Sequence, residues 1–348
     1  MPVAVDNLYL TLVACFITVL ALNLMKNRNF TMLPRPFVIW AAQSLVLVAF
    51  YLGGLVREAH AEPTIYATSF AITGSPLDSN ASKFYQLNAV TGAPTLIGSI
   101  GFSSVSGIDF DSSGVLYGVG QRINNNDPLD RTPVLLQINP ATGAGTQVAA
   151  IKLASNGLNF DPAIQDISFR NSDGALYAYS TGDTYVINKT TGVATLVGNS
   201  GIAAPPQGGA TAFSPADSLH TINQTLVLTT NQTNGLLLHA PTLVTYPEAS
   251  SYATGMDYDN STGKLWATVT IDPPDLLHGV NYLANIDIST GIVTRVGALE
   301  GDLGFQGLTV APGPAVVPEP GSALAGLLAL GICFTGLFSR NRRATVRL

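Results

Sequence analysis

The chain has 348 residues, a formal net charge of −6, and a composition that is 47% hydrophobic but only 11% charged. Its cysteines, Cys15 and Cys333, lie in apolar terminal runs, so the region between those runs has neither a disulfide nor a thiolate metal site. Residues 62–317 carry eight basic and nineteen acidic side chains, a net charge of −11. Such an acidic surface repels phosphate, so we expect no nucleic-acid partner.

An export signal is predicted near the N-terminus. Residues 37–56 form an apolar run, and Ala59 and Ala61 follow it with the small-residue spacing that signal peptidase accepts. We therefore expect a signal peptide over residues 32–61, with signal peptidase cutting after Ala61. The exported chain would then begin at Glu62.

Residues 1–31 leave two interpretations open. They contain another apolar run, residues 8–25, which is followed by Lys26 and Arg28. They are either an extension ahead of a true start at Met32 or an extra membrane helix whose basic loop faces the cytoplasm. Both interpretations export the rest of the chain.

The exported region repeats two hairpin units. The first unit is an apolar strand, an Asp/Ser/Gly turn and a Leu-Tyr strand. It occurs at residues 106–119, 165–179, 210–222 and 254–269. The second unit is a strand ending in Asn or Asp, a Thr-Gly turn and a strand ending in Val-Gly. It occurs at residues 84–98, 135–149, 184–198 and 283–297. Apolar and polar residues alternate within each unit, which is the pattern of β-strands.

These repeats predict an all-β fold, a β-propeller over residues 62–313. Aligned positions in the repeats are 59, 44, 45 and 52 residues apart, which suits blades of four strands; they are Phe110, Phe169, Phe213, Tyr258 and Val310. The last segment, residues 306–312, matches only the innermost strand of a blade, and the first strands supply only the other three. We predict five four-stranded blades, closed by pairing of the N- and C-terminal strands.

An open solenoid of sheets is the alternative architecture. The third copy is the least regular, because we find no Thr-Gly turn between Thr221 and Pro247. Five blades is nevertheless the count that uses every strand and leaves no open sheet edge at the ends of the chain.

The long loops predict where a ligand would bind. In a propeller, loops from the second to the third strand share one face with the links between blades, and here every long loop belongs to that set. Solvated loop carboxylates are the simplest interpretation. The functional alternative is a polar face for carbohydrate or a divalent cation. Its candidate residues are Asp127, Asp130, Asp272, Asp275 and His278.

No catalytic cluster or cofactor site is apparent in the sequence. Residues 109–114 begin like a calcium loop, but position twelve is Gly120 and not a glutamate, so the segment suits a hairpin turn better. The three histidines of the exported region, His220, His239 and His278, are scattered and form no metal pair at helical spacing. We expect no catalytic residue, no metal site and no cofactor.

The C-terminal residues 314–348 have the pattern of a membrane tail. Val317-Pro318-Glu319-Pro320 precedes residues 322–338, a run without charge that spans about 25 Å as a helix. A basic cluster follows, which resists translocation and should stay cytoplasmic; it contains Arg340, Arg342 and Arg343. An ordinary single-pass anchor is one interpretation of this tail.

The tail also resembles the PEP-CTERM sorting signal of Gram-negative bacteria, in which the same motif, helix and Arg cluster occur in the same order. The resemblance covers residues 317–348 only. It implies that the membrane protease exosortase recognises Pro318, Glu319 and Pro320 and removes the tail. It further implies passage through the inner membrane, a transient anchor, and a final place at the cell surface or in a matrix of exopolysaccharide.

We therefore expect an exported surface or matrix protein whose propeller binds a polysaccharide or another ligand without chemistry. The body also looks like uncharacterised secreted bacterial propellers, a resemblance that implies the fold alone. One alternative function is a secreted hydrolase or lyase acting on a polysaccharide or a lactone. Another is a permanently membrane-tethered assembly protein. Two close carboxylates or a histidine converging at the mouth of the central channel would favour an enzyme.

Overall fold

The structure, a computed structural model, describes residues 62–71, 81–123, 131–160, 164–202, 208–271, 280–299 and 303–313. The chain divides into Met1–Glu62 and Pro63–Leu348, and every described strand belongs to the second unit. The described residues include no helix that is long and apolar enough to cross a membrane. The predicted signal peptide, sorting motif, terminal helices and Arg cluster lie outside the described residues and remain predictions.

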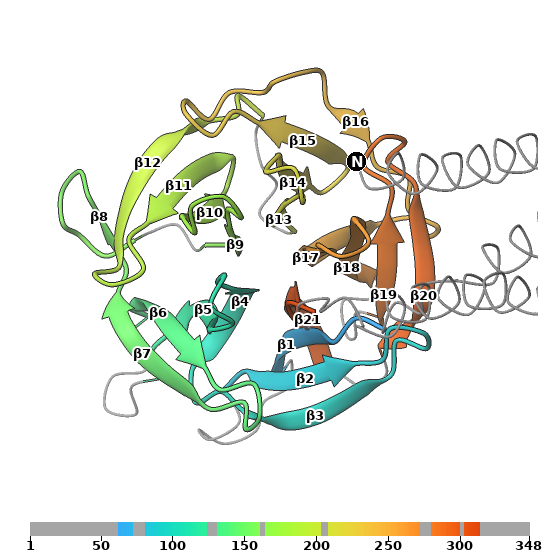
Figure 1. Cartoon of the computed structure of the whole chain (residues 1–348), viewed down its shortest axis with the longest axis horizontal. Coiled ribbons are helices and arrows are strands. Elements are labelled where there is room, and N and C mark those ends of the chain that lie inside the picture. The colour runs from blue at the N-terminus through green and yellow to red at the C-terminus, as the bar shows by residue number, and fades with distance from the viewer. Residues whose placement is uncertain are drawn as a thin grey trace, which may run out of the picture. The chain divides into compact units, whose positions relative to one another are not determined.

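Five separate sheets surround a central axis as the blades of a propeller (Figure 1). The first blade, from the axis outward, is β4 (Ser103–Phe110), β5 (Leu116–Gln121), β6 (Pro133–Ile138) and β7 (Gly145–Ala150). The second is β9 (Asp166–Phe169), β10 (Leu176–Ser180), β11 (Asp183–Ile187) and β12 (Val193–Asn199), with β8 (Lys152–Leu153) parallel to β12 at its outer edge.

The third and fourth blades follow the same plan. The third is β13 (Ala210–Phe213), β14 (Leu219–Asn223), β15 (Leu226–Thr230) and β16 (Thr242–Leu243). The fourth is β17 (Ser251–Asp259), β18 (Lys264–Ile271), β19 (Val280–Ile286) and β20 (Val293–Leu299). Apart from β8, neighbouring strands within every blade are antiparallel.

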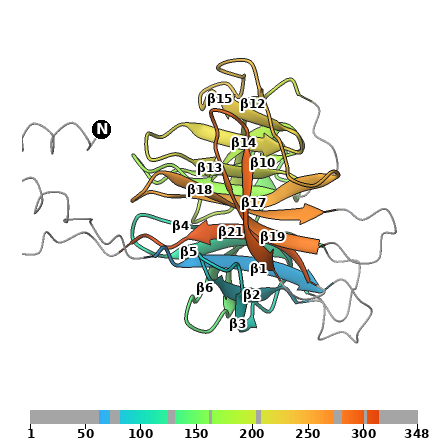
Figure 2. The ribbon, with the colours of Figure 1, turned by 90° about the vertical axis from the view of Figure 1, so that its right-hand side faces the viewer.

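The closing blade combines both ends of the ring, as predicted. Its innermost strand is β21 (Leu303–Val310), and the other three are β1 (Ile65–Ala71), β2 (Lys83–Leu87) and β3 (Pro94–Ser99). Ile65 pairs with Val310, and the Ala311 N–H donates to the Thr64 carbonyl over 2.8 Å. The two ends of the ring therefore leave the same face side by side (Figure 2). The open solenoid is ruled out.

The third blade corrects one detail of the sequence interpretation. Its second hairpin does have the repeated turn, at residues 231–235, where the Gly235 N–H donates to the Asn231 carbonyl over 2.8 Å. The same bond joins Gly92 to Asn88 and Gly192 to Asn188 in other blades. The turn was missed because asparagine replaces the threonine before the glycine, although the hydrogen bond needs only the backbone.

Aromatic pairs join each blade to the next near the face where the chain ends leave. The ring that ends an innermost strand lies against a ring on the second strand of the preceding blade. The pairs are Tyr66–Phe110, Tyr117–Phe169, Tyr177–Phe213 and His220–Tyr258, with centroids 5.1–6.0 Å apart. At the fifth junction Trp266 and Val310 share one apolar cluster. Such aromatic pairs add about 0.5–1.5 kcal/mol each beyond burial of area.

Glycines bring the outer parts of neighbouring blades together. A Cβ added to Gly198 on β12 would lie 2.0 Å from the Asn234 carbonyl oxygen in the next blade's turn. Gly98 on β3 and Gly297 on β20 have equivalent contacts of 2.1 and 1.8 Å with turn carbonyl oxygens. The repeated Val-Gly and Thr-Gly motifs are therefore the two halves of one contact between blades.

We predict that Gly198→Ala destabilises the ring by about 3 kcal/mol, because the new methyl group overlaps a backbone oxygen that cannot move alone. Urea denaturation measures the loss. Gly313→Ala is the matched control, since nothing lies within 4 Å of its added Cβ, and it should be neutral or slightly stabilising. Equal effects of the two substitutions would contradict this account of the repeat.

Candidate functional site

Polar side chains on the innermost strands meet at the axis of the ring. The residue before the terminal aromatic or valine is Asp109 on β4, Ser168 on β9, Asp257 on β17 and Thr309 on β21. The third blade has Ala212 at this position. The Thr309 hydroxyl lies within hydrogen-bond distance of both Asp109 and Asp257, and Ser168 donates a hydrogen bond to Asp109.

These side chains accept backbone N–H groups of the following blade. Asp109 Oδ2 accepts from Phe169 N over 2.6 Å, and Asp257 Oδ2 accepts from Val310 N over 2.8 Å. Between the second and third blades, Asp166 Oδ2 accepts from Thr211 N and Ser168 Oγ accepts from Phe213 N. The inner edge of each sheet has no further strand to pair with, so these oxygens satisfy donors that would otherwise be buried and unpaired.

Two of the carboxyl groups share one hydroxyl. Thr309 Oγ1 lies 3.2 Å from Asp109 Oδ1 and 3.0 Å from Asp257 Oδ2. All three residues have less than a tenth of their surface exposed. The closing strand β21 is thereby tied to the first and the fourth blade at one point.

Asp166 fills the next layer of the axis, where β4, β17 and β21 have glycine and β13 has Ala210. A Cβ on Gly107 would lie 2.8 Å from an Asp166 carboxylate oxygen, and one on Gly255 would lie 2.1 Å from the Gln306 carbonyl. Asp166 is fully buried and accepts from Ile167 N and Thr211 N. The centre of the ring therefore holds a carboxyl group in a space that glycines leave open.

Burial dominates the electrostatics of this axis. It raises the pKa of Asp109 to about 6, although four hydrogen bonds, from Phe169, Phe110, Ser168 and Thr309, act in the opposite direction. Burial also raises the pKa of Asp166 and of Asp257 well above the ordinary value, and the charge of Asp109 adds to both shifts. A buried carboxyl without a cation beside it lowers its free energy by holding a proton.

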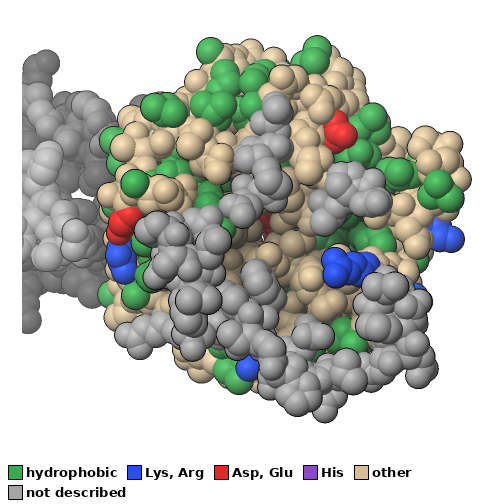
Figure 3. Space-filling view, turned by 180° about the vertical axis from the view of Figure 1, so that it is seen from behind, with side chains coloured by type: hydrophobic (Ala, Val, Ile, Leu, Met, Phe, Trp, Pro, Cys, Tyr) green, Lys and Arg blue, Asp and Glu red, His purple; other side chains and the backbone are tan. Residues whose placement is uncertain are grey.

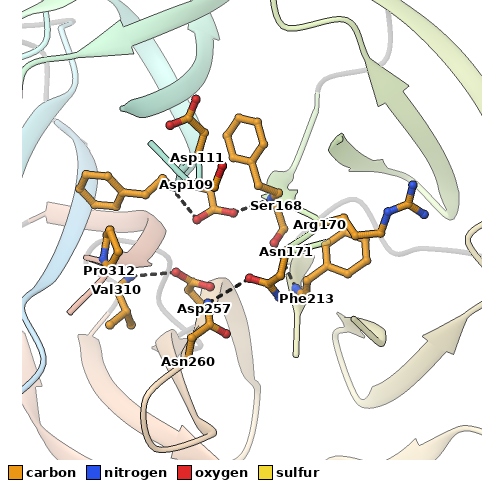
Figure 4. A pocket seen from close by; sticks show the side chains of 13 residues that line it. Asp109, Asp111, Ser168, Arg170, Asn171, Phe213, Asp257, Asn260, Val310 and Pro312 are labelled. Carbon is orange, nitrogen blue, oxygen red and sulfur yellow. Dashed lines mark hydrogen bonds between the residues drawn. The ribbon is translucent and has the colours of Figure 1, made fainter. Parts of the chain in front are cut away.

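A cavity of about 100 Å³ opens above these groups at the mouth of the axis, and every blade contributes to its lining (Figure 4). Asp109 and Asp257 form part of the lining, together with the rings of Phe110, Phe169 and Phe213. Pro312, just after the last strand, completes it. The volume accommodates several water molecules or a small polar group of a larger ligand.

The rim of the cavity is held by turns from the second, third and fourth blades. Asn260 Nδ2 donates to Asn171 Oδ1 over 3.1 Å, a contact between the fourth blade and the second (Figure 4). Asn171 Nδ2 donates in turn to the Ser214 carbonyl, and its backbone N–H donates to Asp217. Ser112 and Asn260 are exposed polar groups at this rim.

The basic side chains near the rim are engaged elsewhere. Lys189 Nζ lies 2.9 Å from Asp111 Oδ2, outside the axis. Burial opposes ionisation of Asp111, but the hydrogen bonds of Ser113 and Lys189 outweigh it and lower the pKa of this carboxyl. Arg170 pairs with Asp173 and also donates to Tyr177 and Gln232. The carboxyl groups at the axis therefore have no basic partner in the described part of the ring.

Chemically, the cavity suits a ligand rich in hydroxyl groups. Carboxyl and amide oxygens accept hydroxyl protons, and phenyl rings cover the apolar face of a sugar-like molecule. A metal is less well supported: in the described ranges no group of three or more His, Cys, Asp or Glu side chains is placed to hold one. Residues 109–114 form the hairpin turn expected of them, with Asp111 Oδ1 accepting from Ser113 N and Val115 N.

The predicted ligand face and the observed cavity involve different residues. Asp127, Asp130, Asp272, Asp275 and His278 lie outside the described residues, so that prediction stays open. On the face opposite the cavity, the described side chains are mostly apolar or uncharged, with isolated charges (Figure 3). Strands β5 and β18, which precede the predicted ligand residues in the sequence, end on this opposite face, at Gln121 and Ile271.

Sequence reasoning missed the carboxyl groups of the axis. The signal was present: Asp109 and Asp257 occupy the same position of two aligned repeats, inside strands, where aspartate is disfavoured. Each follows a glycine by two residues, Gly107 and Gly255. A carboxyl and a glycine on the same side of an innermost strand indicate a crowded polar axis.

The comparisons with known proteins concern the fold alone. No family model matches the sequence, and no curated protein matches it. Among solved structures the chain is similar to the Dos1 propeller, at 17% identity and a TM-score of 0.34 over 55% of this chain and 50% of that one. A TolB-like protein from Agrobacterium tumefaciens aligns at 9% identity over 72% of this chain and 100% of its own, with a TM-score of 0.38. A family GH43 β-1,3-galactosidase with galactodeoxynojirimycin aligns at 10% over 70% and 92%, with a TM-score of 0.45.

We predict that Asp166→Ala lowers the free energy of unfolding by about 3 kcal/mol or more, because it leaves at least two buried N–H groups without an acceptor. Thermal or urea denaturation at constant pH measures the loss. Asp173→Ala is the control, because it removes an exposed carboxylate whose ion pair with Arg170 contributes about 0–1 kcal/mol. A small effect at Asp166 would show that the axis is not held by this carboxyl.

Proposed function

We propose that this chain is an exported surface or matrix protein whose ring binds a hydroxyl-rich ligand, such as a polysaccharide, without chemical conversion. The closed ring supports a body that is stable outside the cell without disulfides, since β21 and β1 leave no open sheet edge at its ends. Export and processing rest on the signal-like N-terminal residues and on the PEP-CTERM resemblance of the tail.

The observation that carries the binding proposal is the cavity to which all five blades contribute. It combines acceptor groups with phenyl rings, the combination that sugars require. Its carboxyl oxygens already accept backbone N–H groups of Phe110, Phe169, Tyr258 and Val310. Groups committed to the ring in this way are better suited to holding a ligand than to attacking it.

The position of the chain ends predicts how the ring would be oriented relative to a membrane that holds the tail. Thr64 and Ala311 are hydrogen-bonded neighbours, and Pro312 lines the cavity. A tail held in the membrane would therefore leave the cavity on the membrane side of the ring. The ends of β5 and β18, at Gln121 and Ile271, would lie on the outward side, and removal of the tail would expose the cavity to large ligands.

The binding site can be tested with the purified ring, residues 62–313, and soluble fragments of the producing cell's own exopolysaccharide. Asn260→Ala removes a rim amide and its bond to Asn171, and we expect it to weaken binding about tenfold, the usual cost of one good hydrogen bond. Calorimetry measures the affinity.

The matched variant for the opposite face is Asp127→Asn with Asp272→Asn. A loss only in this double variant would move the site to the long loops, and no binding by the unmodified ring would refute the proposal. The same samples test the hydrolase alternative, which the shared hydroxyl of Asp109 and Asp257 favours. Release of shortened saccharides, abolished by Asp109→Asn, would establish an enzyme.

The sorting proposal has its own test. We expect Glu319→Ala with Pro320→Ala to leave full-length chain in the inner membrane, because the protease would lose its recognition residues. Fractionation of cells with and without exosortase measures where the chain is found. Glu62→Ala is the control, because it changes an acidic residue that precedes the first strand of the ring and lies outside the sorting motif. Release of the variant chain at the normal rate would contradict the PEP-CTERM interpretation.

A further inference from the structure

The three oxygens at the closure of the ring cannot all be held by one hydroxyl proton. Thr309 Oγ1 is within hydrogen-bond distance of both Asp109 Oδ1 and Asp257 Oδ2, yet a hydroxyl donates only one proton. The second contact is a bond only when the other carboxyl donates to the hydroxyl. Both contacts can be hydrogen bonds at once only if one of the two carboxyl groups carries a proton.

Among the residues that the structure describes, no basic group compensates a second negative charge at this point. From β9 the group that faces the pair is Asp166, of the same sign, whose pKa responds to Asp109. Strands β1, β13 and β21 carry no Asp, Glu, His, Lys or Arg. The charged groups at the ends of β4, β9, β17 and β18 are engaged elsewhere; they are Asp111, Arg170, Asp259 and Lys264.

The pair also sits where the ring is closed. Val310 N donates to Asp257, and the Thr309 hydroxyl reaches Asp109, so β21 is bound to the fourth and first blades through these two carboxyl groups. A second ionisation puts two like charges on either side of one hydroxyl. One of the two hydrogen bonds of the Thr309 hydroxyl is then lost.

We propose that Asp109, Thr309 and Asp257 form a proton-dependent latch that holds the closing strand β21 and loosens as the surroundings become less acidic. A free aspartate titrates near 4, whereas burial raises the pKa of Asp109 to about 6. Between these values the folded chain binds more protons than the unfolded chain, so its stability falls as pH rises through the window. Asp109 and Asp257 of the latch also line the cavity, so their protonation sets the charge of the cavity floor.

Other groups titrate differently. Hydrogen bonds lower the pKa of Asp287, so its contribution to stability is lost only at lower pH. Burial, aided by the charge of His239, lowers the pKa of His220 to about 4, which makes stability rise with pH up to the ordinary histidine range. His220 packs on Tyr258, outside the latch, and its opposing effect is common to every variant below.

Hydrogen exchange of the full-length chain in detergent micelles tests the latch. After correction for intrinsic exchange, protection of β21 should fall about tenfold or more between pH 5 and pH 7.5 relative to β6, since one pKa unit corresponds to a tenfold change. Strand β6 is the internal control because it carries no charged side chain and is the third strand of its blade, away from the axis. An equal change in both strands would overturn the proposal, with no variant needed.

Two variants sharpen the test. Asp109→Asn removes one titrating group while keeping its size, so the pH dependence of β21 should become smaller, although the buried Asp257 still titrates. Asp111→Asn removes a carboxylate two residues away that pairs with Lys189, and the dependence should persist. Retention of the full dependence in Asp109→Asn would overturn the latch. So would recovery of β21 protection at pH 7.5 on adding millimolar Ca²⁺ to the unmodified chain but not to Asp109→Asn, since the carboxyl groups would then hold a cation.

Discussion

The ring depends on side-chain oxygens that accept the unpaired backbone N–H groups of the innermost strands. A sheet that stops at a central axis leaves one edge unpaired, and water cannot reach donors that are this deeply buried. Asp109, Asp166, Ser168 and Asp257 each reach across to the next blade and satisfy one of them. Every junction that has such an acceptor is thus joined by backbone as well as by apolar contact. The junction from the third to the fourth blade has alanine instead and is joined by apolar contact, with Ala212 and Tyr258 in one buried cluster and His220 packed on Tyr258.

The outer half of each junction follows a different rule. At three junctions the backbone of one blade's turn meets a glycine on the fourth strand of the preceding blade, with no space for a Cβ; these glycines are Gly98, Gly198 and Gly297. At the other two junctions the glycine is in the turn, where Gly192 and Gly291 lie against the carbonyl groups of Ala150 and Leu243. Polar atoms join the blades at the axis, aromatic rings join them farther out, and glycine contacts join them near the rim. The repeated sequence motifs correspond to these three sets of contacts between blades. Segments outside these contacts can differ from blade to blade without loss of the ring, as the short strand β16 of the third blade shows.

The fold was predictable because these layers recur in the sequence. Spacing of Phe110, Phe169, Phe213, Tyr258 and Val310 predicted five blades, and the incomplete first and last copies predicted that β21 would pair with β1. The site was not predictable in the same way. Asp109 and Asp257 stand out in the sequence as aspartates within strands, but the neighbouring residues do not show whether such a side chain faces a closed axis or solvent. Only the closure of the ring brings Thr309 between two residues that are 148 positions apart in sequence.

The cavity and the closure of the ring share their residues, and this constrains how a ligand can be recognised. The floor is fixed, because replacing Asp109 or Asp257 by a residue without an acceptor leaves the N–H group of Phe169 or Val310 unsatisfied. The rim is free to vary, because Ser112 and Asn260 lie on exposed turns. Specificity is therefore expected to reside in the turns between the first and second strands of each blade, while the floor supplies acceptors whose charge follows the protonation of the latch. A ligand that donates hydroxyl protons gains most when the floor is ionised, the condition in which β21 is held less tightly. Binding and ring stability would then respond in opposite directions to the same proton.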